Sequence, residues 1–114
     1  MKHKAQWRPT KYQPNGDKWV ISRNSAELSP ASSISATLAL NATLPALAKH
    51  VRGDLADFGC GTAPFYGAYQ PLTKSVSWID WPSSPHETQH LDVVADLNQP
   101  VDLPADQFLS LIHI

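Results

Sequence analysis

The fold of this chain is set by residues 54–65, DLADFGCGTAPF. The stretch is an apolar run that closes on Asp57, continues through Gly59 and Gly61, and reaches Pro64. Glycine adopts the backbone angles of a tight turn and lets a ligand approach the main chain closely. In α/β proteins, a strand that enters such a turn and continues into a helix commonly ends at a nucleotide-like ligand. We therefore predict a strand that ends at Asp57 and opens on a ligand site.

A helix is predicted ahead of this strand, over residues 29–49. Ser29 suits the N-cap and Pro30 suits the first helical position. Pro45 is expected to kink or restart the helix, because proline removes one backbone hydrogen bond from a helix interior. The apolar side chains expected on one face of the helix are Ile34, Leu38 and Leu40.

Two more strands are predicted after the turn, at residues 75–80 (SVSWID) and 91–97 (LDVVADL). Between the first two strands, PFYGAYQPL has room only for a short helix that stops before Pro71. Strands alternating with helical connections indicate a parallel sheet. The predicted fold class is therefore α/β, a partial Rossmann-like parallel sheet of three strands with an N-terminal helix.

Composition and charge indicate one small domain with a basic start. The chain has 114 residues, and its single cysteine, Cys60, excludes an internal disulfide, so we expect a cytoplasmic protein. No apolar run is expected to span a membrane. Six of the nine Lys and Arg residues lie within residues 1–28, where KWVIS at 18–22 predicts a short strand. We expect a solvated basic arm there, and contact with an anionic substrate or a nucleic acid is the alternative.

Three acids stand at or near the ends of the predicted strands, namely Asp57, Asp80 and Asp96. Ligands of parallel α/β sheets lie beyond the carboxyl ends of the strands, so these carboxylates are expected to line one rim. Each acid also has a purely structural interpretation, as a helix cap, a turn opener before Pro82, or the start of an Asx-turn.

The turn is wrong for a ligand that carries phosphate. A dinucleotide-binding GxGxxG pattern would need glycine at residue 64, which is Pro64, and Asp57 would repel a pyrophosphate. No GxxxxGK[ST] run is present. S-adenosylmethionine instead carries a sulfonium and an α-ammonium group, both of which Asp57 would attract. Asp80 would suit the ribose hydroxyls, Trp81 the adenine ring, and Asp96 the adenine amino group.

These segments resemble the motifs of class I S-adenosylmethionine-dependent methyltransferases over residues 29–108. LADFGCGTA resembles the first motif, with Ala63 in place of its third glycine. VSWIDW resembles the second motif and VVADLNQPVDLPADQF the third. The resemblance implies methyl transfer from S-adenosylmethionine to an acceptor that the motifs leave open, and it implies no particular catalytic residue or metal. The cofactor-binding residues that it implies are Asp57, Gly59, Cys60, Gly61, Asp80, Trp81, Asp96 and Leu97.

The last residues, LSLIHI at 109–114, resemble the translation of a transposase-adapter end used in sequencing libraries. We expect the true reading frame to run out at Phe108. Residues 109–114 would then be a non-native tail. The chain would then be an N-terminal fragment with strands one to three of a seven-stranded sheet. Its first strand would be an exposed edge, so the isolated chain is expected to be unstable or to aggregate. The alternative is a genuine short fourth strand.

Other interpretations of the sequence stay open. HETQH at residues 86–90 has the spacing of a zinc-protease helix, but Pro82 and Pro85 before it and the strand-like LDVV after it leave space for about one helical turn. Cys60 is expected to pack beneath the turn, since no base is paired with it. The alternative functions are a non-catalytic nucleotide-binding module and a fragment of an NAD-dependent oxidoreductase.

Overall fold

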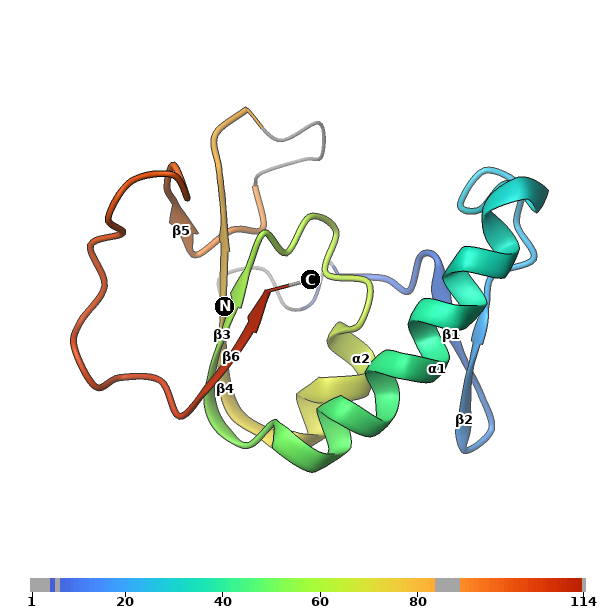
Figure 1. The fold of residues 1–114 in the computed structure, drawn as a ribbon, viewed down its shortest axis with the longest axis horizontal. Coiled ribbons are helices and arrows are strands. Elements are labelled where there is room, and N and C mark those ends of the chain that lie inside the picture. The colour runs from blue at the N-terminus through green and yellow to red at the C-terminus, as the bar shows by residue number, and fades with distance from the viewer. Residues whose placement is uncertain (1–4, 6, 84–88, 114) are drawn as a thin grey trace.

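The computed structural model describes residue 5, residues 7–83 and residues 89–113 of the chain. The described residues form a mixed α/β fold with a four-stranded parallel sheet in the order β5-β4-β3-β6, and a separate two-stranded hairpin. Figure 1 shows helices α1 and α2 on the same side of the sheet as the hairpin, and the long segment before β6 on the other side. The predicted α/β class with a parallel sheet is confirmed at this level.

The N-terminal segment folds as a hairpin of β1 (Tyr12–Asn15) and β2 (Lys18–Ile21). The strand predicted within residues 18–22 is confirmed, whereas its partner β1 was not expected. Gly16 makes the reversal with a φ of 60°, in the left-handed region that favours glycine. Tyr12 is buried and its ring stacks on Phe65 at 4.4 Å between centroids, which joins the hairpin to the glycine turn.

Helix α1 (Ser33–His50) follows a short 3₁₀ turn, Pro30–Ser32. The predicted start is confirmed, because the Ser29 side chain accepts a hydrogen bond from the Ser32 N–H. The expected restart was wrong, because the helix is continuous through Pro45; the expected kink stays a prediction. Packing on both sides of the proline, through Leu40 and Leu47, outweighs the hydrogen bond that proline removes.

The expected buried face of α1 was also wrong in part. Ile34 and Leu38 are 73% and 65% exposed, whereas Ala36, Leu40 and Leu47 are buried. The helix buries the small Ala36 side chain and exposes the larger Ile34 and Leu38, which the expectation that large apolar side chains are buried did not predict.

By length and composition alone, the helical stretch Pro30–His50 is long and apolar enough to cross a membrane, contrary to the expectation from the sequence. Core helices of soluble proteins satisfy the same criterion. Helix α1 packs on the hydrophobic core through Ala36, Leu40 and Leu47, but only 17% of this apolar stretch is buried, so core packing accounts for part of its apolar character.

The sheet follows the predicted order along the chain. Strand β3 (Gly53–Phe58) leads through the glycine turn to α2 (Tyr66–Tyr69) and the 3₁₀ turn Gln70–Leu72. Strand β4 (Thr73–Asp80) then pairs in parallel with β3. The third predicted strand is much shorter than expected and comprises only β5 (Val93–Val94).

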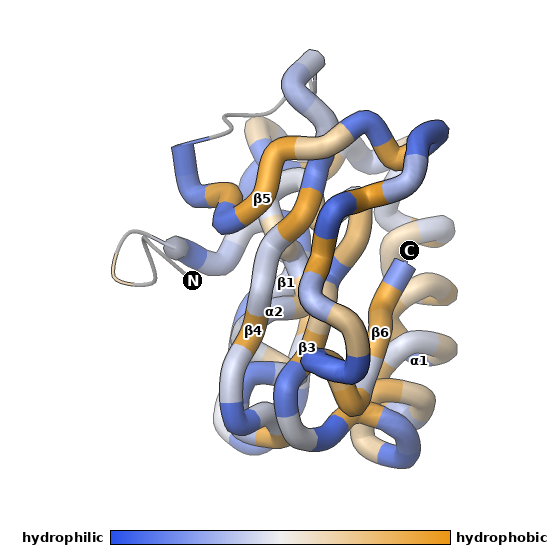
Figure 2. The backbone as a smooth tube through the Cα atoms, turned by 90° about the vertical axis from the view of Figure 1, so that its left-hand side faces the viewer, coloured by the Kyte–Doolittle hydropathy of each residue, from blue (hydrophilic) through white to orange (hydrophobic). Residues whose placement is uncertain are grey.

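Strand β6 (Ser110–His113) corrects the expectation of three strands, since it pairs in parallel with β3. Strand β3 therefore lies between β4 and β6 and is not an edge of the sheet. Figure 2 shows the strands side by side, with β6 at one edge and α1 behind them. On β6, Ser110 and Ile112 are buried whereas Leu111 is 65% exposed, so the residues alternate between the two faces. The non-native origin of residues 109–114 stays a prediction.

Candidate functional site

A cavity of about 630 Å³ lies over the glycine turn. Its volume falls within the range of about 300–1,000 Å³ that is usual for small-molecule sites. One wall comes from β3 and the turn, with Asp57, Gly59, Cys60, Gly61, Thr62, Pro64 and Phe65. The other lining residues come from the N-terminal segment and α1, namely Thr10, Lys11, Tyr12, Glu27 and Ala39. The cavity is therefore formed by the sheet together with the N-terminal segment and α1.

The turn places alternate residues in the left-handed region. The φ angles of Gly59, Gly61 and Ala63 are 64°, 52° and 48°. Alanine in this conformation is disfavoured by roughly 1 kcal/mol, and Ala63 is held there while almost fully buried. The turn is tied to the neighbouring strand because the Gly59 N–H donates to the Ile79 carbonyl at 2.8 Å. The backbone beside Asp57 is thus fixed by the fold.

Asp57 sits at the end of a buried hydrogen-bond chain. The Trp78 Nε1–H donates to the Tyr69 hydroxyl oxygen at 3.0 Å, and that hydroxyl donates to Asp57 Oδ2 at 2.5 Å. Trp78 and Tyr69 are fully buried, and Asp57 is 5% exposed. No hydrogen bond to Asp57 Oδ1 is found among the described residues, and Asp57 lines the cavity. The Tyr69 hydroxyl therefore holds Oδ2 of Asp57, whereas Oδ1 is available to a ligand.

Burial raises the pKa of Asp57 from 3.8 to about 6. The hydrogen bond from Tyr69 opposes this rise, the negative charge of Asp80 adds to it, and His113 lowers the pKa again. Desolvation penalises the charged form of a carboxylate, whereas a donor to the carboxylate favours it. At neutral pH Asp57 is ionised at a cost to stability, a state typical of functional sites.

Asp80 lies across the same turn and uses both carboxylate oxygens on the backbone. Its Oδ2 accepts from the Gly61 N–H at 2.9 Å, and its Oδ1 accepts from the Trp81 N–H at 2.8 Å. Asp80 thereby occupies the N–H group that an anionic ligand would use at such a turn. Two carboxylates, Asp57 and Asp80, consequently flank the glycine turn and disfavour a phosphate there.

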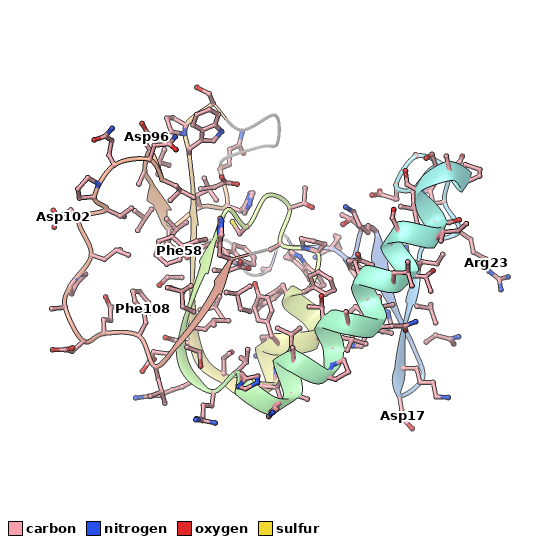
Figure 3. The ribbon with its side chains drawn as sticks, in the orientation of Figure 1. Asp17, Arg23, Phe58, Asp96, Asp102 and Phe108 are labelled. Atoms are coloured by element: carbon pink, nitrogen blue, oxygen red, sulfur yellow. The ribbon has the colours of Figure 1, made fainter. Side chains whose placement is uncertain are left out.

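Four of the predicted residues do not line this cavity, namely Asp80, Trp81, Asp96 and Leu97. Trp81 is 43% exposed. Asp96 is exposed, and its Oδ1 accepts hydrogen bonds from the Asn98 backbone and side chain, which is the Asx-turn alternative. In Figure 3, Asp96 lies on the side of the sheet away from α1. Leu97 lies near the turn, since its Cδ1 is 4.0 Å from the position that a Gly59 Cβ would occupy.

Cys60 lines the cavity between the two glycines but is 5% exposed. Burial, together with Asp57 and Asp80, raises the pKa of the Cys60 thiol well above its usual range. The thiol is therefore protonated at neutral pH and is a poor nucleophile.

Of the HETQH sequence, His86 and Glu87 lie outside the described residues. His90 Nε2 lies 2.7 Å from the Gly61 carbonyl oxygen, to which it donates. Among the described residues, no group of three or more His, Cys, Asp or Glu side chains is placed to hold a metal ion.

A second cavity, of about 280 Å³, adjoins the first and shares Thr10 and Thr62 with it. Its other lining residues are Trp7, Arg8, Trp78, Gln89 and His90. The two cavities thus meet on either side of Thr62, at the tip of the glycine turn.

Sequence reasoning missed the N-terminal lining of the first cavity and the support of Asp57. The cluster of Lys and Arg residues near the N-terminus indicated that one of them could contact a ligand, although it did not identify Lys11. Tyr69 and Trp78 gave no signal, because their link to Asp57 depends on pairing between strands and on the path of α2. No family model, no curated protein and no solved structure matches the chain significantly.

Proposed function

We propose that this chain binds S-adenosylmethionine in the cavity over the glycine turn, within a Rossmann-like sheet, and that the site serves methyl transfer. The observation that carries the proposal is the buried carboxylate of Asp57 in the wall of a cavity large enough for such a ligand. A cation beside Asp57 would offset the free energy of keeping that carboxylate ionised and buried. The sulfonium and α-ammonium groups of S-adenosylmethionine meet this requirement.

Backbone geometry supports the same ligand class. Gly61 lines the cavity and has no Cβ atom, so the ligand can approach the main chain there, whereas the His113 and Leu97 side chains lie where a Gly59 Cβ would point. Asp80 keeps the Gly61 N–H engaged, which argues against a dinucleotide whose pyrophosphate would need that group. Asp80 is buried and does not line the cavity, so we assign it to support of the turn and not to the ribose hydroxyls.

Bound S-adenosylmethionine would supply an electrophilic methyl group, so the protein's task is to hold the donor and the acceptor in line. Asp57 would fix the charged end of the donor, and the turn would fix its body. The second cavity, beyond Thr62, is the place that we assign to the methyl acceptor. We assign no catalytic base.

Asp57→Ala provides the test. Thermal stabilisation of the folded protein by S-adenosylmethionine and by NAD should be compared for the wild type and this variant. We expect the wild type to respond to S-adenosylmethionine, and Asp57→Ala to lose most of that response. The matched control is Asp17→Ala, whose side chain lies at the hairpin tip in Figure 3 and should leave the response unchanged. A response to NAD that Asp57→Ala increases would favour the oxidoreductase alternative and overturn the proposal.

A further inference from the structure

We propose that Lys11 binds the α-carboxylate of S-adenosylmethionine in the cavity that Asp57 also lines, so that the cavity recognises the amino-acid end of its ligand by both charges. The inference rests on the proposed function and assigns a role to the basic N-terminal segment. It makes Lys11 a specificity-determining residue that selects ligands carrying a carboxylate.

Charge in the cavity wall is the first observation. Among the described residues that line the cavity, Lys11 is the one Lys or Arg, whereas Asp57 and Glu27 supply negative charge. A zwitterionic ligand needs an acceptor for its ammonium group and a donor for its carboxylate. Asp57 meets the first need, and Lys11 is the charged donor that can meet the second.

The backbone of Lys11 is held in place relative to the turn. Its carbonyl accepts a hydrogen bond from the Ser22 N–H at 2.8 Å, so both sides of the hairpin fix its position. The next residue, Tyr12, is 3% exposed and stacks on Phe65, which also lines the cavity. Lys11 therefore stands one residue from a buried anchor.

The Lys11 side chain is available for a ligand. It is exposed, and no hydrogen bond or ion pair of its ammonium group is found among the described residues. Other cations of the hairpin segment, such as Lys18 and Arg23, do not line the cavity. Figure 3 shows Arg23 directed away from the sheet at the outer side of the hairpin and helix. The basic segment thus places Lys11 at the first cavity, and its Arg8 lines the adjoining second cavity.

The test compares two ligands that differ only in the carboxylate. Binding of S-adenosylmethionine and of decarboxylated S-adenosylmethionine should be measured by calorimetry for the wild type and for Lys11→Met. The matched control is Lys18→Met, which removes a cation from the same hairpin outside the cavity. We expect Lys11→Met to weaken S-adenosylmethionine binding roughly tenfold to a hundredfold, as for loss of a charge-assisted hydrogen bond. Binding of the decarboxylated ligand should change less than about twofold, and Lys18→Met should change neither.

The outcomes separate this inference from the proposed function. Equal losses for both ligands, or no loss for either, would overturn the assignment of Lys11 while leaving S-adenosylmethionine as the ligand. Failure of the folded wild type to bind either ligand would overturn the proposed function and this inference with it. Circular dichroism of each variant would identify a loss that comes from unfolding, and Lys11→Arg should then restore selectivity for the carboxylate if Lys11 acts as assigned.

Discussion

Replacing Asp57 with asparagine should make the protein more stable at neutral pH. The asparagine would keep the size of the side chain and could still accept the hydrogen bond from Tyr69, but it could not ionise. In the wild type, the pKa of Asp57 rises from 3.8 to about 6 on folding. Because this pKa is higher in the folded state, the folded protein holds a proton between these pH values that the unfolded chain has released. Stability is thus greatest below the unfolded pKa and falls as the pH rises through the folded pKa.

The size of the effect follows from the pKa difference. One pKa unit corresponds to about 1.36 kcal/mol, so ionising the buried carboxylate lowers the free energy of unfolding by about 3 kcal/mol at pH 7.5. Asp57 is 5% exposed, so solvent provides little screening. We expect Asp57→Asn to exceed the wild type by about 3 kcal/mol at pH 7.5, and by under about 1 kcal/mol at pH 4.0.

Urea denaturation followed by tryptophan fluorescence at both pH values would measure this difference. The exposed Asp17→Asn is the matched control and should change stability little at either pH. A variant that is less stable than the wild type at pH 7.5, or that shifts stability equally at both pH values, would show that burial of the Asp57 charge does not limit stability. The same substitution removes the charge that the proposed ligand needs, so higher stability and weaker S-adenosylmethionine binding should occur together.

Two neighbouring tyrosines and one glycine give further predictions. The Tyr66 hydroxyl is buried and has no hydrogen-bond partner among the described residues, so Tyr66→Phe should leave the free energy of unfolding unchanged or raise it by about 1 kcal/mol. Tyr69→Phe should lower the free energy of unfolding by about 2 kcal/mol and raise the pKa of Asp57 further, because the Tyr69 hydroxyl donates to that carboxylate. Equal effects of Tyr66→Phe and Tyr69→Phe in urea denaturation would contradict this contrast. A Cβ at residue 67 would overlap the Trp19 ring at Cη2. Gly67→Ala should therefore destabilise the protein and shift its tryptophan emission, although alanine favours helix, and a more stable variant would count against the packing of the hairpin on α2.

The sequence predicted those features that depend on neighbours in the chain. The Ser29 cap, the strands around Leu55 and Trp78, and the turn at Gly59 all follow from local patterns. The placement of Asp57 at the turn follows too, because parallel strands place their carboxyl ends at the same edge.

Features that depend on distant contacts were missed or predicted wrongly. The pairing of β6 with β3 relies on residues far apart in the chain, and the passage of α1 through Pro45 relies on packing against the core. Asp96 satisfies its own local turn, so its place near the end of a predicted strand did not bring it to the cavity. Lys11 reaches the cavity because Tyr12 docks on Phe65, a contact that no local pattern contains.

Calorimetric titration of the wild type with S-adenosylmethionine at pH 7.0 and pH 5.0 probes the proposed role of Asp57 in a single experiment. We predict saturable binding of one ligand per chain at pH 7.0, with affinity roughly tenfold weaker at pH 5.0 because most of Asp57 is then protonated. The Asp57→Asn variant should bind weakly and equally at both pH values. Absence of saturable binding by the folded wild type at pH 7.0, or an affinity that does not change with pH, would contradict the proposal that the Asp57 carboxylate holds a cationic cofactor.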